Sequence, residues 1–133
     1  MTYRTDASAT DPDVNLIERW YEAQDETVQA AFDYMLRLIL ATNDLTDSKQ
    51  FKALERQHAG LWEVVVEVRK KNGKKRQIRP VGFWDTNQMD FILVNACEKC
   101  GRFTVPPGVF DAALVTKSEF FYQAKGTIHE YTF

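Results

Sequence analysis

A dense cluster of basic side chains occupies residues 69–79 of this 133-residue chain, in the stretch RKKNGKKRQIR. Its members are Arg69, Lys70, Lys71, Lys74, Lys75, Arg76 and Arg79, and the stretch contains no acidic residue. Such side chains can bind the phosphates of a polyanion, because affinity for nucleic acid depends on local positive charge. They are also common at solvated hairpin tips. Both interpretations stay open from the sequence.

The charge of the chain is unevenly distributed. Residues 1–60 contain six Lys and Arg against eleven Asp and Glu, whereas residues 61–133 contain eleven against eight. The formal net charge is −2. This balance does not exclude a nucleic-acid partner, since phosphate binding depends on the potential of one surface and not on the total charge.

Cys97 and Cys100 form one CxxC pair, which raises the question of zinc. A structural zinc site needs four ligands, and only His58 and His129 could complete the set. We therefore expect no metal and no cofactor. Two cysteines are also too few for a disulfide scaffold, and we expect both to be reduced.

Length and composition predict one domain over residues 1–133. The chain is 44% hydrophobic, which is enough for a packed core and excludes a disordered composition. It contains no apolar run of the roughly 18 residues that a membrane span needs, and its first residues lack the apolar stretch of a signal peptide. We expect a cytoplasmic protein without a membrane partner, and we expect residues 1–10 to be flexible.

Residues 11–56 have the apolar periodicity of helices. Asp11 followed by Pro12 predicts a first helix start, because aspartate caps a helix and proline fits its first position. Ile17, Trp20 and Tyr21 then share one helical face.

A second helix is predicted to start at Asp25. Its apolar positions recur every three or four residues, at Val28, Ala31, Phe32, Met35, Leu36 and Ile39. Asp47 and Ser48 predict a short third helix that carries Phe51 and Leu54.

The period changes to that of a sheet over residues 61–100. One face of the first strand, residues 61–69, holds Trp62, Val64, Val66 and Val68, and the other holds Glu63, Glu67 and Arg69. Asn72-Gly73 predicts a tight hairpin, so residues 74–84 should return antiparallel. The basic cluster then straddles this hairpin. A turn at 85–88 leads to a central strand at 91–97, covered by helices.

The C-terminal part predicts a helix over residues 107–125, ended by Gly126, and a short strand over 127–133. The fold class is therefore α+β: an N-terminal helical hairpin, an antiparallel sheet of three to four strands and a C-terminal helix.

Three stretches in this order, KALERQHAGLWEV, RPVGFW and FILVNACEKCGRFTVPPGVFDAAL, resemble the RelE/HigB superfamily of bacterial toxins, in particular its phage-derived RelE/ParE branch. The resemblance covers roughly residues 14–122. The matching positions are Lys52 and Leu54, Gly60 to Glu63, Arg79, Phe91 to Cys97 with Lys99, Pro106 or Pro107, and Ala112 or Ala113. The chain departs from the pattern at Val65, where relatives carry arginine, and at Glu98, which stands beside the single Lys99.

The resemblance implies the toxin of a type II toxin–antitoxin system with a RelE/ParE-like fold. Such a toxin is a metal-independent endoribonuclease, an mRNA interferase that acts at the ribosome and inhibits translation. Its partners would be mRNA, the ribosome and a cognate antitoxin, with which it forms a hetero-oligomer. The chemistry needs a base for the 2′-hydroxyl proton, cations around the phosphorus and an acid for the leaving oxygen.

Within this resemblance, Arg79 and Lys99 are the candidates for stabilising charge on the phosphate, with Arg76 as a further catalytic candidate. Strand alternation puts Arg76 and Arg79 on opposite faces, unless Pro80 marks a bulge, and we prefer Arg79. His129 and Tyr131 are the candidates for proton transfer. The expected RNA-binding residues are Arg69, Lys70, Lys71, Lys74, Lys75 and Arg102.

Several alternatives stay open. Arg79 could instead form a structural ion pair with Glu63 or Glu67 on the neighbouring strand. His129 and Tyr131 could be packed or simply exposed. A ParE-like protein on the same fold would poison DNA gyrase without cutting RNA, and a non-catalytic module would only bind RNA or protein.

Overall fold

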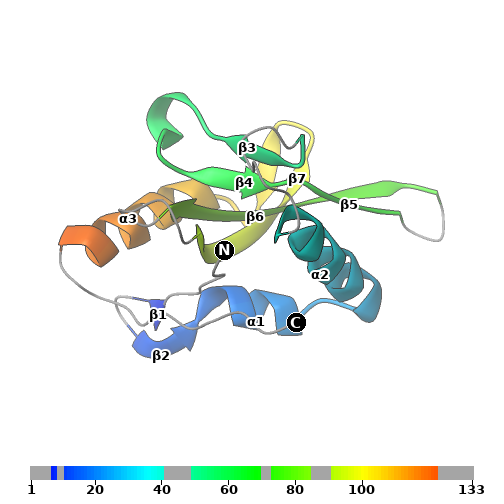
Figure 1. Cartoon of the computed structure of the whole chain (residues 1–133), viewed down its shortest axis with the longest axis horizontal. Coiled ribbons are helices and arrows are strands. Elements are labelled where there is room, and N and C mark those ends of the chain that lie inside the picture. Colours follow the sequence, from blue (N-terminus) through cyan, green and yellow to red (C-terminus); the bar gives the residue numbers. More distant parts are fainter. Residues whose placement is uncertain (1–6, 9–10, 41–48, 70–72, 85–90, 123–133) are drawn as a thin grey trace.

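The computed structural model describes residues 7–8, 11–40, 49–69, 73–84 and 91–122 (Figure 1). The helices are α1 (Leu16–Glu22), α2 (Glu26–Leu40) and α3 (Val109–Tyr122), and a short 3-10 turn, η2, spans Arg56–His58. The main sheet contains β3 (Phe51–Ala53), β4 (Trp62–Val64), β5 (Val66–Arg69), β6 (Lys75–Trp84), β7 (Phe91–Cys100) and β8 (Phe103–Val105). A separate two-stranded ladder joins β1 (Ala7–Ser8) to β2 (Asp11–Asn15).

The main sheet is antiparallel and runs in the order β3-β4-β6-β7-β8, with β5 also paired to β6. The strand predicted over residues 61–69 is interrupted at Val65. It forms two strands, β4 and β5, which both pair with β6. The α+β class, the N-terminal helical hairpin and the C-terminal helix are confirmed. The predicted three to four strands are too few, because the short strands β3 and β8 extend the sheet at its two edges.

Helices cover both faces of the sheet. α1 and α2 pack on one face through a core that includes Ile17 and Phe32, and α3 packs on the other through Val109 and Ala113. α3 lies toward the end of β6 that is far from the β5–β6 hairpin (Figure 1). A strand buried on both sides has no polar face, which explains the continuous apolar run that opens β7. The predicted central strand is confirmed.

A bulge in β7 adjusts the two longest strands to each other. Val81 pairs with Asn95 and Gly82 pairs with Leu93, so one extra residue of β7, Val94, lies between these pairs. After the bulge, Ala96 faces the α1–α2 core and Cys97 faces the α3 core. A Cβ atom on Gly82 would lie 2.1 Å from the carbonyl oxygen of Ile92, so only glycine fits here.

Two helix starts predicted from the sequence are wrong. Asp11 and Pro12 belong to β2, and the first helix begins at Leu16, because pairing with β1 overrides the local capping signal. The predicted third helix is replaced by β3. Phe51 is buried there and stacks on Trp62 with ring centroids 4.9 Å apart, so a cross-strand aromatic contact decides this segment.

Other local predictions hold. Asp25 caps α2, since its Oδ1 accepts a hydrogen bond from the backbone N–H of Val28 at 2.9 Å. Ile17, Trp20 and Tyr21 share the core-facing side of α1. The hairpin is present as β5 paired with β6. Asn72 of the predicted hairpin turn, the turn predicted at 85–88 and the strand predicted at 127–133 lie outside the described residues. No helix within the described ranges is long and apolar enough to span a membrane.

Replacing Gly82 with alanine should destabilise the protein by about 1–3 kcal/mol, because the new methyl group overlaps the β7 backbone at the bulge. Urea unfolding of the two proteins measures this loss. Gly73→Ala is the comparison, since its Cβ meets nothing within 4 Å and only its φ of +81° is unfavourable. A smaller loss at Gly82 than at Gly73 would contradict the close approach.

Tyr21→Phe should remove a hydrogen bond between α1 and α2 whose contribution to stability depends on pH. The Tyr21 hydroxyl donates to Asp33 Oδ2 at 2.6 Å, and burial followed by this hydrogen bond raises the pKa of Tyr21 to about 12. A folded-state pKa above the unfolded value of about 10 means that this stability is present at neutral pH and lost as pH rises from 10 to 12.

Urea unfolding between pH 7 and pH 12 checks this expectation. At pH 7 the Tyr21→Phe variant should be less stable by about 1–2 kcal/mol, and this gap should close as pH rises through the stated window. Tyr34→Phe is the matched control, because the Tyr34 side chain is exposed. A constant gap at every pH would contradict the assigned hydrogen bond.

Candidate functional site

The side chain at the centre of the candidate site is Arg79, which is only 7% exposed although it is charged. It lies in the middle of β6, where β4 and β5 flank it on one side and β7 on the other. We call the surrounding surface the Arg79 face. It consists of Lys52, Glu63, Glu67, Lys75, Gln77, Arg79 and Lys99. Strand pairing puts these residues on one side of the sheet, because directly opposed residues point to the same face.

Arg79 uses only part of its hydrogen-bonding capacity. Its Nη2 donates to the side-chain oxygen of Gln77 at 2.6 Å, and its Nε lies 3.8 Å from Glu63 Oε1. Nε and Nη1 are buried and have no hydrogen-bond partner within the described residues. A buried charged donor without a hydrogen-bond partner costs more free energy than a neutral donor in the same state. An oxygen acceptor placed beside these two nitrogens would therefore form favourable hydrogen bonds.

Gln77 fixes one end of this guanidinium. Its amide nitrogen donates to Glu67 Oε1 at 3.0 Å, and Lys75 Nζ lies 3.8 Å from Glu67 Oε2. The amide can point only one way, since the guanidinium of Arg79 only donates and the carboxylate of Glu67 only accepts. Gln77 is not among the site residues predicted from the sequence, although its place two residues before Arg79 on the same strand puts both on one face.

Lys99 joins the same face from β7. It pairs directly with Gln77, and Arg79 pairs with Cys97. Arg79 and Lys99 are therefore diagonal neighbours, a relationship in which Cα atoms lie roughly 7–8 Å apart and long side chains still meet. The structure thus brings together the two residues that the resemblance indicates for phosphate stabilisation, one buried and one exposed.

Two neighbours define the chemistry further. Burial raises the pKa of the Cys97 thiol to about 12, and the charge of Glu63 contributes in the same direction, so Cys97 stays protonated and is no nucleophile. Lys52 is exposed on β3 directly opposite Glu63. Lys52 is one of the positions that match the resemblance. The register of β3 and β4 shows that it lies beside Glu63.

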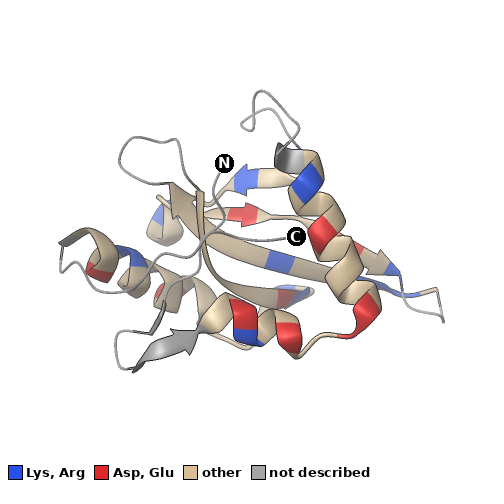
Figure 2. Ribbon diagram, turned by 60° about the horizontal axis from the view of Figure 1, so that its bottom comes forward, with Lys and Arg blue, Asp and Glu red and all other residues tan. Residues whose placement is uncertain are grey.

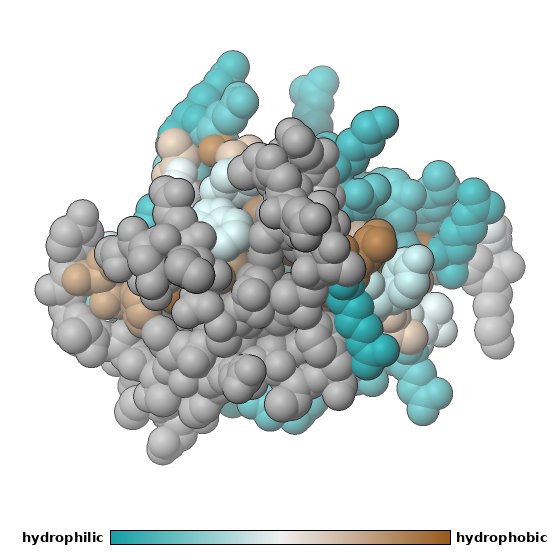
Figure 3. Space-filling view, in the orientation of Figure 1, coloured by the Kyte–Doolittle hydropathy of each residue, from teal (hydrophilic) through white to brown (hydrophobic). Residues whose placement is uncertain are grey.

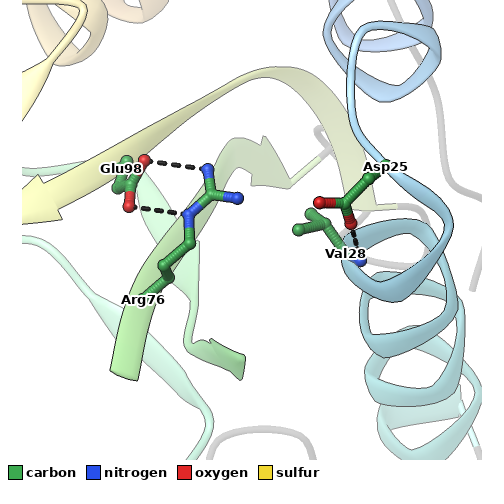
Figure 4. Close-up of polar contacts among 4 residues, drawn as sticks. All are labelled: Asp25, Val28, Arg76 and Glu98. Atoms are coloured by element: carbon green, nitrogen blue, oxygen red, sulfur yellow. Dashed lines mark hydrogen bonds and ion pairs between the residues drawn. The ribbon is translucent and has the colours of Figure 1, made fainter. Parts of the chain in front are cut away.

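Arg76 lies on the opposite side of the sheet, as strand alternation predicts. Its Nε and Nη2 donate to the two carboxylate oxygens of Glu98, each at 2.9 Å, and this bidentate bond is the first cause of its raised pKa (Figure 4). Its guanidinium also points toward Asp25 at the start of α2 (Figure 4). Arg76 is therefore not brought together with Arg79, and it links β6, β7 and α2.

Four of the expected RNA-binding residues are described, and they lie at or next to the ends of strands. Arg69, Lys74, Lys75 and Arg102 are exposed. Figure 2 shows basic residues at the end of the β5–β6 hairpin and acidic residues along α1 and α2, and Figure 3 shows hydrophilic side chains projecting around that hairpin. Lys70, Lys71, His129 and Tyr131 lie outside the described residues.

The two cysteines do not share a site. Cys97 is buried and Cys100 is exposed, and both are free thiols. In the part of the chain that the structure describes, no group of three or more His, Cys, Asp and Glu side chains is arranged to hold a metal ion.

Arg76→Gln should lower the stability of the protein by about 1 kcal/mol, because it removes a bidentate, partly buried ion pair that joins β6 to β7. Urea unfolding measures the loss. Lys75→Gln is the control, since its contact with Glu67 is longer and half-exposed and should contribute less than about 0.5 kcal/mol. Equal losses in the two variants would show that Arg76 has no special structural role.

Comparison with protein-family models, with curated proteins and with solved structures finds no match for this chain.

Proposed function

We propose that this protein is a RelE/HigB-type toxin with a RelE/ParE-like fold, and that it cleaves mRNA at the ribosome as a metal-independent endoribonuclease. The observation that carries the proposal is the buried guanidinium of Arg79, two of whose nitrogens have no hydrogen-bond partner among the described residues, on the same sheet face as Lys99. Translation arrest follows from cleavage of the message.

The Arg79 face suits the chemistry of RNA cleavage. When the 2′-oxygen attacks phosphorus and the 5′-oxygen leaves, negative charge builds on the non-bridging phosphate oxygens. Donors that are already fixed in place stabilise this charge without reorganising. Gln77 holds Arg79 in such a fixed position, and Lys99 supplies a second cation from the neighbouring strand. Loss of one such donor typically costs about 10² to 10³ in rate.

The hairpin supplies the sequence-independent part of RNA binding. Arg69 and Lys74 flank the turn and are exposed, and Lys75 follows on β6. Contacts of this kind position a phosphate backbone and weaken as salt concentration rises. The cognate antitoxin would cover this basic surface and the Arg79 face until it is released.

One observation favours a second candidate, a non-catalytic RNA-binding module on the same fold. Glu63 lies 3.8 Å from Arg79, so the pair also fits the structural ion pair considered above. Both candidates use the same surface, and they differ only in whether the bound RNA is cut. A third candidate is a protein that poisons gyrase, and the experiment below distinguishes it from the other two.

Replacing Arg79 and Lys99 together with glutamine should abolish toxicity. Pulse-labelled protein synthesis in induced bacteria, with mapping of transcript 5′-ends from the same cultures, measures the effect. The wild type should arrest translation and create new transcript ends, and the double variant should do neither. The matched control is Arg19→Gln with Arg37→Gln, which removes two exposed positive charges on α1 and α2, the helices that cover the opposite face of the sheet.

Continued translation without new transcript ends in the wild type would remove the ribonuclease proposal. Blocked replication in those cells would then indicate gyrase as the target, and healthy cells would indicate the binding module. New ends that persist in the Arg79 and Lys99 double variant would place the active site elsewhere in the chain.

A further inference from the structure

Among the described residues, Glu63 has the carboxylate nearest to the guanidinium of Arg79. It lies in β4, its side chain is 13% exposed, and its Oε1 is 3.8 Å from Arg79 Nε. This separation is too long for a hydrogen bond, so the contact is an electrostatic attraction alone. Within the described ranges no donor forms a hydrogen bond to the Glu63 carboxylate, and its oxygens therefore keep free lone pairs.

The other nearby carboxylates are already engaged. Glu67 accepts a hydrogen bond from Gln77 and pairs with Lys75. Glu98 is held by both nitrogens of Arg76 on the opposite side of the sheet. A general base needs a free lone pair within reach of the proton that it removes. Among these three carboxylates, only Glu63 combines a free lone pair with a place beside Arg79.

Charged and titratable groups face Glu63 from three strands. Lys52 lies opposite on β3, Arg79 on β6, and Cys97 and Lys99 on β7. Before any proton moves, the Glu63 carboxylate offsets part of the positive charge of Arg79. Once Glu63 is protonated, that full charge acts on the phosphate. Arg79 would thus stabilise the transition state more than the bound RNA, which is the condition for catalysis.

We propose that Glu63 is the general base of the proposed ribonuclease, an assignment that rests on the proposed function. The 2′-hydroxyl O–H bond breaks and its proton moves to a Glu63 carboxylate oxygen. The 2′-oxygen forms a bond to phosphorus, and the bond from phosphorus to the 5′-oxygen breaks. The leaving oxygen takes a proton from water. The products are a 2′,3′-cyclic phosphate and a 5′-hydroxyl, and Glu63 returns its proton to solvent.

Glu63→Gln tests this assignment, because it keeps the shape of the side chain and removes its basicity. Cleavage of mRNA in a purified translation system should fall about 10² to 10⁴-fold in kcat. The Kd for a 2′-O-methyl RNA of the same sequence, which cannot be cut, should stay within twofold. Glu55→Gln is the matched control, since Glu55 is exposed and its side chain caps nothing at η2; its kcat should equal that of the wild type.

The pH dependence of kcat separates a base from a structural residue. The kcat of the wild type should rise with pH along one limb of its profile, because a general base acts only when it is unprotonated, and Glu63→Gln should lack this limb. Glu63→Asp keeps a carboxylate and should retain the limb at a lower kcat, which keeps the test decisive where the glutamine variant unfolds. Formate should restore activity to Glu63→Ala, because a small carboxylate can replace the missing base.

The outcomes distinguish the two proposals. A wild type that cuts RNA together with a Glu63→Gln variant of similar kcat would overturn the assignment of Glu63 and leave the proposed function standing. Loss of the rising limb in Glu63→Asp would overturn it as well. A wild type that binds the 2′-O-methyl RNA but cuts no message would overturn the proposed function and the general base with it.

Discussion

The long pairing of β6 with β7 is the constraint on which the rest of the molecule depends. Both strands are ten residues long, and helices cover each face over part of their length. Burial on both sides admits only apolar residues there, such as Phe83 and Leu93. Polar side chains can occur only where the helical cover ends. Within the described residues, the Arg79 face lies where α3 no longer covers the sheet.

Two arginines three residues apart illustrate how strand geometry assigns different roles. Arg76 donates two hydrogen bonds to Glu98 and faces the start of α2, whereas Arg79 is buried on the other side, where its Nε and Nη1 have no hydrogen-bond partner in the part of the chain that the structure describes. A buried charge without full pairing is costly, and proteins retain such groups where binding or catalysis uses them. The difference in pairing, more than the number of basic residues, distinguishes the candidate site from the solvated hairpin.

Much of the fold could be predicted because its signals are local. Asp25 caps α2 through its own side chain, and the Asn72-Gly73 pair predicts the hairpin that β5 and β6 form. The misassigned segments depend on partners outside the segment itself: Phe51 becomes part of a strand because it stacks on Trp62, and β2 exists because it pairs with β1. The bulge also depends on a distant contact, since Gly82 is required by a carbonyl of β7.

The candidate site shows the same division. Alternation along β6 predicts that Arg76 and Arg79 lie on opposite faces, and the structure confirms it, whereas only the register of β6 and β7 shows that Lys99 shares the face of Arg79. Alternation alone says nothing of hydrogen bonds, so Gln77 could not be recognised as the residue that holds Arg79. The burial of Arg79 could not be predicted either. It results from packing between strands, and the sequence alone does not give the extent of that packing.

The order of elements along the chain has a consequence for biosynthesis. α1 and α2 leave the ribosome well before β7, the strand on which α1 packs. Until β7 is made, the apolar side of α1, including Ile17, lacks the strand that it covers in the folded protein. The strands from β5 to β8, by contrast, pair with near neighbours in sequence and close short loops, which makes their association fast. The nascent chain therefore completes its main sheet late, and α1 stays an exposed, chaperone-accessible segment until then.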